Sequence, residues 1–208
     1  MIARLVRPAL SLLVAMTLLL GLAYPLAITG VARLAFPYQA GGSLVHKDGA
    51  LIGSTLIGQS FSEPKYFRGR PSATTPQPYN AIASTGSNLG PLNPALIDAV
   101  KANIKALKDL DPGNSHSVPV ELVTASASGL DPEIGPAAAE YQAGRVARAR
   151  GTSIENVHAL LVAHERGRFI GLFGEPRINV LELNLALDAQ YPVVGSSVQS
   201  TTPSAPTG

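Results

Sequence analysis

The sequence predicts a single N-terminal transmembrane helix followed by one soluble α/β domain of mixed, loop-rich architecture. Three observations lead to this prediction. No charged residue occurs in the 25 residues from Pro8 to Ala32. The chain beyond this run is long enough for one domain with its own core, because domains average about 150 residues. The chain also has 20 Gly and 17 Pro in 208 residues, which indicates long loops between its elements.

Composition excludes several classes of function. There is no Cys, which rules out a disulfide scaffold, a cysteine zinc site and a thiol nucleophile. The net charge is +2, but Arg4, Arg7 and Arg33 flank the uncharged run and all 14 acidic residues follow it. The remaining chain is therefore close to neutral. Since nucleic-acid binding needs a broad basic surface, we expect no nucleic-acid partner.

The uncharged run predicts a retained membrane anchor over residues 8–33. A helix of this length crosses a hydrocarbon core of about 30 Å. The alternative is a cleaved signal peptide, whose apolar stretch is shorter, about 7–15 residues, and ends in a small-residue cleavage site. Two arginines precede the run and one follows it directly. This bias predicts that residues 1–7 are cytoplasmic and that residues 34–188 form an extracytoplasmic domain.

One face of the anchor carries small residues. Thr17 and Gly21 are spaced i, i+4, as are Ala23 and Ala27, and such spacing lets a partner's helix approach closely. We therefore assign Thr17 and Gly21 as candidate partner-binding residues. Ordinary lipid-facing composition is the equal alternative. Pro25 lacks a backbone donor and is expected to kink the outer half of the helix.

The first elements of the domain follow from turn and cap signals. Residues 43–57 predict a β-hairpin around Asp48-Gly49, since this pair suits a turn with positive φ. Asn93-Pro94 predicts a helix start, with Asn as the cap, and the helix runs to about Leu110. Residues 118–124 predict a short strand.

The remaining elements lie towards the C-terminus. A helix is predicted over Pro136–Arg150, ended by Gly151. Thr152 with Glu155 forms a candidate capping box for a third helix. Residues 169–172 are a strand candidate, and residues 178–187 predict a mostly buried helix with a strand as the alternative.

The last segment, residues 189–208, has the composition of a disordered tail. It is rich in Ser, Thr and Pro, with no charged residue.

No catalytic constellation stands out. The histidines are scattered, and no Gly-x-Ser-x-Gly motif occurs. Ser84–Gly90 resembles a phosphate cradle, so Ser87 and Asn88 are candidate nucleotide-binding residues. However, the glycine spacing differs from a Walker loop and no Lys follows. A membrane-anchored extracytoplasmic hydrolase, or a binding module unrelated to transport, remains an alternative function.

The segment Phe61–Ser72 combines three aromatic and three cationic residues between prolines. Aromatic residues and Arg are enriched at binding hot spots, so Phe67, Arg68 and Arg70 are candidate partner-binding residues. The equal alternative is a loop folded onto its own sheet with Arg–aromatic stacking. Asn88 and Asn93 belong to a second candidate docking loop.

Four blocks of residues give the sequence a resemblance to a known family. They are Gly53–Gln59 followed by the loop ending Phe67-Arg68-Gly69-Arg70-Pro71-Ser72; Pro78-Tyr79-Asn80-Ala81 with Ser84–Pro91 and Asn93-Pro94; Val123–Ser126 with Ser128–Pro132, Pro136–Ala139 and Gln142-x-x-Arg145-Val146-Ala147; and Gly174–Asp188. In this order, the pattern resembles the C subunit of the Kdp-type potassium-transporting ATPase. The sequence departs from the family at Gly135, where Ser is usual, which predicts a weaker helix cap, and in its added tail.

The resemblance implies a non-catalytic accessory subunit in the bacterial inner membrane. Its partners would be a channel-like potassium-binding subunit, a P-type catalytic subunit and a small helical subunit, together with membrane lipid. The family is described as needed for assembly and as a catalytic chaperone that raises the ATP affinity of the catalytic subunit. The phosphorylation motif Asp-Lys-Thr-Gly-Thr is missing from this sequence. ATP is thus implied only through the catalytic subunit, and no cofactor or metal is expected on this chain alone.

Overall fold

The computed structural model describes residues 2–193. The chain groups into two compact units, Met1–Leu56 and Ile57–Gly208. The predicted disordered tail begins at residue 189, but Ala189 and Gln190 belong to the last helix. The part of the predicted tail from residue 194 onward lies outside the described residues.

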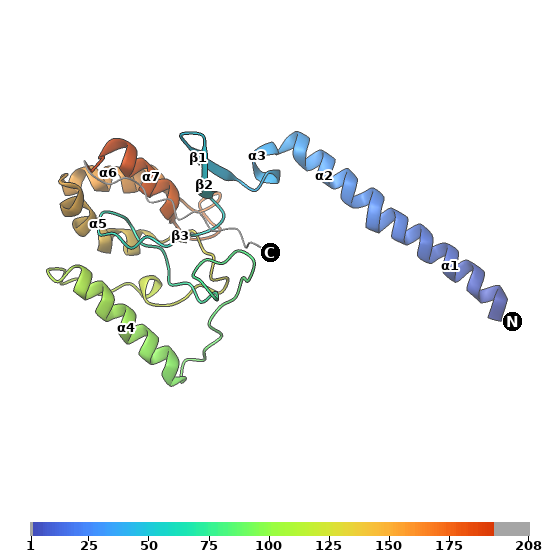
Figure 1. The fold of residues 1–208 in the computed structure, drawn as a ribbon, viewed down its shortest axis with the longest axis horizontal. Helices are drawn as coiled ribbons and strands as arrows, with labels where there is room; N and C mark the ends of the chain where they lie inside the picture. The colour runs from blue at the N-terminus through green and yellow to red at the C-terminus, as the bar shows by residue number, and fades with distance from the viewer. Residues whose placement is uncertain (1, 194–208) are drawn as a thin grey trace, which may run out of the picture. The chain divides into compact units, whose positions relative to one another are not determined.

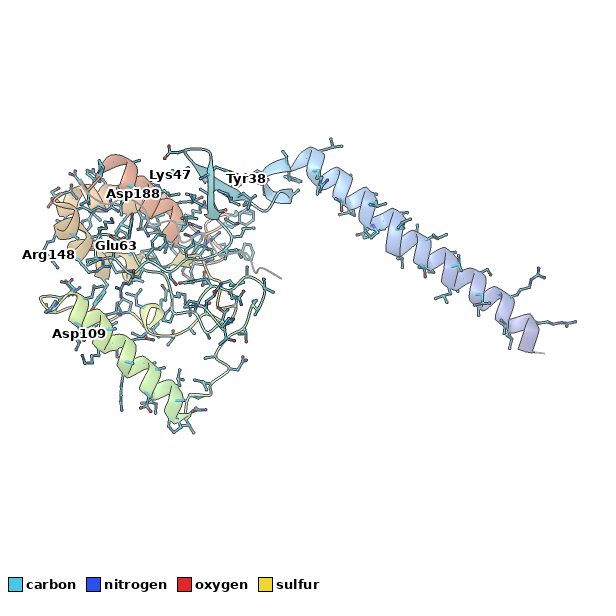
Figure 2. All side chains as sticks on the ribbon, in the orientation of Figure 1. Tyr38, Lys47, Glu63, Asp109, Arg148 and Asp188 are labelled. Carbon is cyan, nitrogen blue, oxygen red and sulfur yellow. The ribbon has the colours of Figure 1, made fainter. Side chains whose placement is uncertain are left out.

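The first unit contains a long helix in three consecutive segments, α1 (Ile2–Leu18), η1 (Leu19–Ala23) and α2 (Tyr24–Ala35). The helix over Arg4–Ala35 is long and apolar enough to cross a membrane, and its apolar stretch is not buried within the structure. Figure 1 shows the helix as a ribbon, and Figure 2 shows the side chains that project from it on all sides. The predicted membrane helix is thus present as a candidate span by length and composition.

Pro25 has a local effect on this helix. A proline at this position cannot donate to the carbonyl of Gly21, four residues earlier. The preceding turn widens into the π-helical segment η1, in which the Tyr24 amide donates to the carbonyl of Leu19, five residues back. Widened turns of this kind are one of the known responses to an interrupted α-helical ladder.

A short helix, α3 (Pro37–Ala40), and a hairpin follow in the same unit. Strands β1 (Leu44–Lys47) and β2 (Ala50–Ser54) pair antiparallel, with Lys47 opposite Ala50. The turn residues Asp48 and Gly49 have φ of 51° and 79°. These are the angles of a type I′ turn, which matches the twist of paired strands. The predicted hairpin is confirmed.

The second unit combines helices with a small antiparallel sheet, as the predicted α/β class requires. Helices of this unit pack against the central strand of the sheet, as can be followed in Figure 1. The sheet has the strand order β3-β5-β4, with β5 in the centre. The elements are α4 (Pro94–Leu110), η2 (Val120–Leu122), β3 (Glu133–Ile134), α5 (Pro136–Arg150), α6 (Ile154–His164), β4 (Glu165–Arg166), β5 (Arg177–Asn179) and α7 (Val180–Gln190).

The core of this unit lies between α5, α6, α7 and the central strand. Helix α5 buries four alanines there, which lets neighbouring elements approach its backbone closely. Phe67, Ile178, Leu183 and Leu187 are at most 1% exposed. The core therefore combines a loop residue, a strand and two helices distant in sequence.

Local sequence signals predicted the ends of α4 and α5 correctly. The Asn93 side chain accepts a hydrogen bond of 2.9 Å from the Ala95 amide, and Pro94 is the first helical residue. Helix α5 ends at Gly151, which has a left-handed φ of 64°. At α6 the predicted cap was wrong by one residue. Ser153, not Thr152, accepts from the Asn156 amide, and Thr152 instead accepts from the Asn156 side chain.

The structure shows which group Gly135, a departure from the family pattern, contacts at the start of α5. Gly135 makes no side-chain cap, as expected, but its amide donates to a carboxylate oxygen of Glu121 at 2.7 Å. A Cβ at this position would lie 3.0 Å from both of those oxygens. Glycine therefore leaves room for a distant carboxylate at the positive end of α5.

Two sequence predictions of strands were wrong, and the predicted helix over residues 178–187 is confirmed from Val180 onward. Residues 118–124 contain the 3₁₀ turn η2, because Pro119 starts a tight turn and Val120 accepts from both Val123 and Thr124. Residues 169–172 form a turn closed by a single bridge between Phe169 and Phe173, and the strand lies earlier, at β4. Within residues 178–187, the first two residues belong to strand β5 and the rest to helix α7. Asn179 ends β5 and caps α7 through its side chain.

Candidate functional site

The segment Phe61–Ser72 is folded onto its own domain. Phe67 is fully buried in the core, and Phe61 packs against that core and against Tyr66, with 5.4 Å between ring centroids. Lys65 is also buried and pairs with Glu63 at 2.9 Å. Of the two interpretations left open by the sequence, the structure favours the loop that folds onto its own chain, but side chains of helices α5 and α7 hold it rather than a sheet. The partner-binding role of Phe67, Arg68 and Arg70 stays a prediction, and the Phe67 side chain offers no surface for it.

Two amide side chains hold the backbone of this segment. Asn184 on α7 accepts from the Phe67 amide and donates to the Phe67 carbonyl, both at 2.9 Å. Gln142 on α5 accepts from the Arg68 amide at 2.9 Å and donates to the Arg68 carbonyl at 3.1 Å. Each amide thereby pairs with both polar groups of one residue, as a neighbouring strand would. Buried backbone groups need such partners.

Two buried arginines complete the attachment of the segment. Arg145 donates to the carbonyls of Pro64 and Tyr66. Burial, and then the nearby Arg68 charge, lower the pKa of Arg145 to about 10. Arg150, with a fully buried side chain, pairs with Asp188 at 2.9 Å.

Arg150 also binds backbone and an aromatic ring. It donates to the Lys65 carbonyl at 2.8 Å and lies 5.0 Å from the centroid of the Tyr66 ring. The Tyr66 hydroxyl donates to Asp188. Burial first, and then the Asp188 charge, raise the pKa of Tyr66 to about 12. The predicted Arg–aromatic stacking is thus present, but through Arg150 of α5.

The end of the segment is tied to two further loops. Tyr79 donates from its hydroxyl to the Arg70 carbonyl at 2.6 Å, and burial raises its pKa to about 12. Its ring passes so close to Gly58 that a Cβ there would lie 2.4 Å from a ring carbon. Arg70 pairs with Asp131 at 3.4 Å. The Ser72 hydroxyl accepts from the Tyr79 amide and donates to the Gly129 carbonyl.

The candidate nucleotide loop lies elsewhere on the surface. Ser87 and Asn88 are exposed, and Asn88 has a positive φ of 52°. The loop is attached by its neighbours, since the Thr85 amide and the Ser84 hydroxyl both donate to the Ser128 carbonyl. The Asn93 side chain is occupied by the α4 cap. Nucleotide binding at Ser87 and Asn88 stays a prediction.

The remaining sequence candidates, Thr17 and Gly21, belong to the first unit. A Cβ on Gly21 would lie 3.9 Å from the Thr17 methyl group and close to nothing else. The helix surface beside Thr17 and Gly21 therefore has room for an added side chain. Their role in partner binding stays a prediction.

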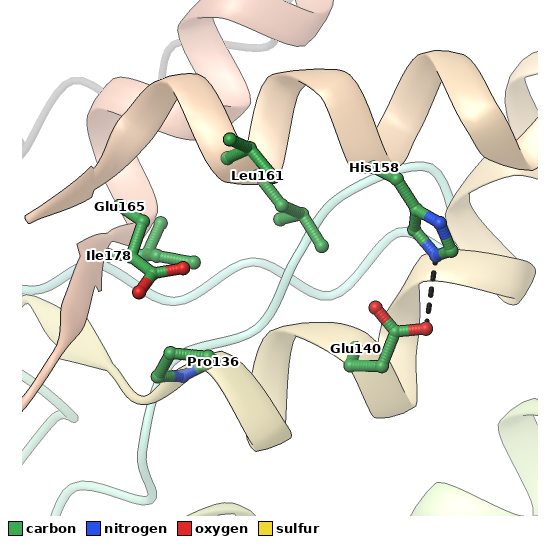
Figure 3. A pocket seen from close by; sticks show the side chains of 7 residues that line it. Pro136, Glu140, His158, Leu161, Glu165 and Ile178 are labelled. Carbon is green, nitrogen blue, oxygen red and sulfur yellow. Dashed lines mark ion pairs between the residues drawn. The ribbon is translucent and has the colours of Figure 1, made fainter.

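The described residues also contain a hollow of about 250 Å³ between α5 and α6. Four apolar residues line it, Pro136, Leu161, Val162 and Ile178, together with the polar residues Glu140, His158 and Glu165. Figure 3 shows His158 paired with Glu140, with 3.0 Å between Nε2 and Oε1. Within the described residues, no group of three His, Asp or Glu side chains is placed to hold a metal ion.

Sequence reasoning missed Gln142 and Asn184 as organising residues. Each has an apolar residue directly before and after it in its helix, and each is 1% exposed. A polar side chain on a buried helical face must find hydrogen-bond partners. That position was the available signal, but the partners are 74 and 117 residues away.

Comparison with known proteins connects this geometry to a family. The family described as "K+-transporting ATPase, c chain" matches residues 6–189. This chain belongs to the KdpC family. A KdpC subunit of the potassium-transporting ATPase from Variovorax paradoxus is 65% identical over 184 residues, which cover 88% of this chain and 95% of the relative. That from Polaromonas naphthalenivorans is 63% identical over 187 residues, covering 90% and 95%.

The sequence blocks that resemble KdpC meet in space. The first block supplies Phe67 and Arg68, the third supplies Gln142 and Arg145, and the fourth supplies Asn184 and Asp188, all within one hydrogen-bond network. In this KdpC chain, the residues that carry the resemblance thus build the domain.

Proposed function

We propose that the chain is a non-catalytic accessory subunit of an ATP-driven, high-affinity potassium uptake complex. The observation that carries this proposal is the family match over residues 6–189, together with relatives named as subunits of a potassium-transporting ATPase. Hydrolysis would occur in a P-type catalytic partner. A channel-like potassium-binding subunit and a small helical subunit would complete the complex.

The use of the polar side chains supports a structural role. Arg145, Arg150, Gln142 and Asn184 hold the chain's own backbone. The hydroxyls of Ser72 and Ser84 donate to main-chain carbonyls. Groups engaged in this way rigidify a domain, and a rigid domain binds partners with little ordering cost.

We place the chain in the bacterial inner membrane as a single-pass protein. Arg4 and Arg7, which precede the uncharged run, favour a cytoplasmic N-terminus and an extracytoplasmic main domain. A Cys introduced at the exposed Ser115 should react with an impermeant thiol reagent in intact cells. Because the chain has no native Cys, labelling only after lysis would reverse the assigned orientation.

The proposed effect on ATP affinity is indirect. With this orientation the domain is separated from a cytoplasmic nucleotide site, and the hollow presents carboxylates that repel phosphate. A subunit that favours one conformation of a complex changes affinity at a distant site, typically by about 1–3 kcal/mol. We expect the detergent-solubilised chain alone to bind Mg-ATP no more tightly than about 1 mM. Micromolar binding that Ser87→Ala or Asn88→Ala abolishes would establish direct contact instead.

The test of the function is purification of the whole complex with and without this chain. We expect the complex lacking it to lose subunits during purification or to need more ATP for half-maximal hydrolysis. Gly21→Leu should weaken copurification without affecting membrane insertion, since Leu favours the bilayer at least as much as Gly. A complex of unchanged composition and ATP dependence without the chain would exclude the accessory role.

A further inference from the structure

The most exposed apolar cluster of the second unit is a hairpin at residues 168–174, here called the apolar hairpin. Its side chains Phe169, Ile170, Leu172 and Phe173 are 70%, 79%, 73% and 62% exposed. Scattered apolar residues are ordinary on protein surfaces, but four large ones in five positions form a contiguous patch. Such patches are typical of surfaces that bind another molecule.

The apolar hairpin has a defined shape. The amides and carbonyls of Phe169 and Phe173 bond to each other at 2.8 and 3.0 Å. Gly171 and Gly174 have φ of 70° and 80°, which glycine adopts without strain. The patch is therefore a preformed turn, and little conformational entropy is lost when such a turn binds.

Ile170 is an unfavourable residue for the folding of this turn. Its φ is 54°, a left-handed value that a β-branched residue rarely adopts. Such strain costs of order 1–3 kcal/mol and is concentrated at functional sites. Asn or Gly would fit the angle and would not expose an apolar side chain. Folding of the domain alone does not explain an isoleucine here.

The charges around the patch indicate the chemistry of its partner. At the base of the hairpin, Arg166 pairs with Glu182, Arg168 with Glu175, and Arg177 with Glu133, at 2.7, 2.7 and 2.9 Å. These ion pairs leave no excess of positive charge to attract lipid headgroups. Directly before the hairpin in the chain, Val162 and Glu165 line the hollow. In the chain, the patch therefore follows residues of a hollow that is lined by apolar side chains and by carboxylates.

We propose that the apolar hairpin and the hollow form one docking surface for another subunit of the potassium-transporting ATPase. The partner would present an apolar groove for the hairpin and a Lys or Arg side chain for the hollow. This inference rests on the proposed accessory role and assigns that role to particular residues. Membrane lipid is the competing occupant, and the neutral hairpin base argues against it.

The experiment uses a matched pair of substitutions in the full complex. Ile170→Asn introduces a residue that tolerates positive φ and removes the apolar side chain. Ile82→Asn makes the same change at a site that is 98% exposed outside the hairpin. We expect Ile170→Asn to weaken binding to the other subunits about tenfold while thermal stability stays the same or rises. Ile82→Asn should bind as the unsubstituted chain does.

The outcomes separate the inference from the proposed function. If the unsubstituted chain does not copurify with the ATPase subunits, the accessory role fails. If it copurifies and Ile170→Asn does so equally well, only the docking surface is wrong. Equal loss of binding in Ile82→Asn would also exclude a specific surface.

A charge reversal and a fluorescence probe complete the test. Glu165→Lys should also weaken binding to the other subunits. Unchanged binding would contradict the role of the acidic side chains in the docking surface. The chain has no Trp, so Phe173→Trp gives a single reporter within this subunit. In a complex whose other subunits also lack Trp, brominated lipid should leave its fluorescence unchanged. Quenching by that lipid would overturn the proposal in favour of membrane insertion.

Discussion

Two loops of similar composition differ in burial, because one packs into the core and the other is exposed to solvent. The segment Phe67–Arg70 and the apolar hairpin 168–174 both combine Phe, Gly and Arg. Phe67 is fully buried, whereas Phe169 is 70% exposed. The difference lies in what the rest of the chain supplies. Gln142 and Asn184 bind the backbone of the first loop, while the hairpin satisfies its own amides within its turn. Aromatic and Arg content alone therefore does not identify a binding loop.

The largest expected effect concerns the buried ion pair that holds the internal segment. Arg150→Met leaves Asp188 without its buried partner and removes the donor to the Lys65 carbonyl. Breaking a buried pair by removing one member costs about 3–5 kcal/mol. Denaturant unfolding of the full chain in detergent should show this loss. A change smaller than about 1 kcal/mol would mean that solvent reaches the pair freely.

Replacing one amide clamp should have the next largest effect. Asn184→Leu removes the partner of both the Phe67 amide and the Phe67 carbonyl. An unsatisfied buried polar group costs about 1–3 kcal/mol, so we expect a loss in that range or slightly above it. Hydrogen exchange at the Phe67 amide should accelerate in parallel. Exchange as slow as in the unsubstituted chain would show that another group replaces the amide.

Alkaline pH should weaken the internal segment through Tyr79. Burial raises its pKa to about 12, above the ordinary value near 10. Between these values the folded chain keeps a proton that the unfolded chain loses, so the free energy of unfolding falls as pH rises. Below this window Tyr79 adds no pH dependence.

Tyr79→Phe isolates this effect from the other titrating groups. The variant should be about 1 kcal/mol less stable at neutral pH, since it loses the bond to the Arg70 carbonyl. Its stability should then fall less steeply than that of the unsubstituted chain above about pH 10. Parallel stability curves for the two proteins would show that Tyr79 ionises normally.

The smallest expected effect concerns the surface of the hairpin. Arg168 and Glu175 form an ion pair with side chains 47% and 79% exposed. Exposed pairs contribute about 0–1 kcal/mol, so Arg168→Gln should leave the unfolding midpoint nearly unchanged. A loss similar to that of Arg150→Met would mean that the hairpin belongs to the cooperative core, and the contrast between the two loops would disappear.

Sequence reasoning succeeded where the signals are local. Asn93-Pro94 and Gly151 define helix ends through their own hydrogen bonds and angles, and Asp48-Gly49 defines a turn. It failed for residues 118–124, where a β-rich composition follows a proline that starts a 3₁₀ turn. For residues 177–190, strand and helix both occur, because Asn179 is at once the last strand residue and a helix cap.

The site was harder to predict because its interactions are long-range. Nothing near Phe67 in the sequence indicates that Asn184 will bind its backbone. The resemblance blocks showed which residues matter, and composition suggested that the Phe67 segment could bind a partner. The structure buries Phe67 in the core, whereas Arg68 and Arg70 are partly exposed. The exposed hairpin was missed as a surface because its apolar residues were interpreted as a strand.

The most direct test of this contrast is a paired substitution, Phe67→Ala and Phe173→Ala, each measured for thermal stability and for binding to the other ATPase subunits. Phe67→Ala should cost about 3–5 kcal/mol of stability, because it leaves a cavity in the core, while the folded fraction still binds its partners. Phe173→Ala should change stability by less than about 0.5 kcal/mol and should weaken partner binding. The reverse pattern, with stability unchanged in Phe67→Ala and binding unchanged in Phe173→Ala, would contradict the assignment of the two loops.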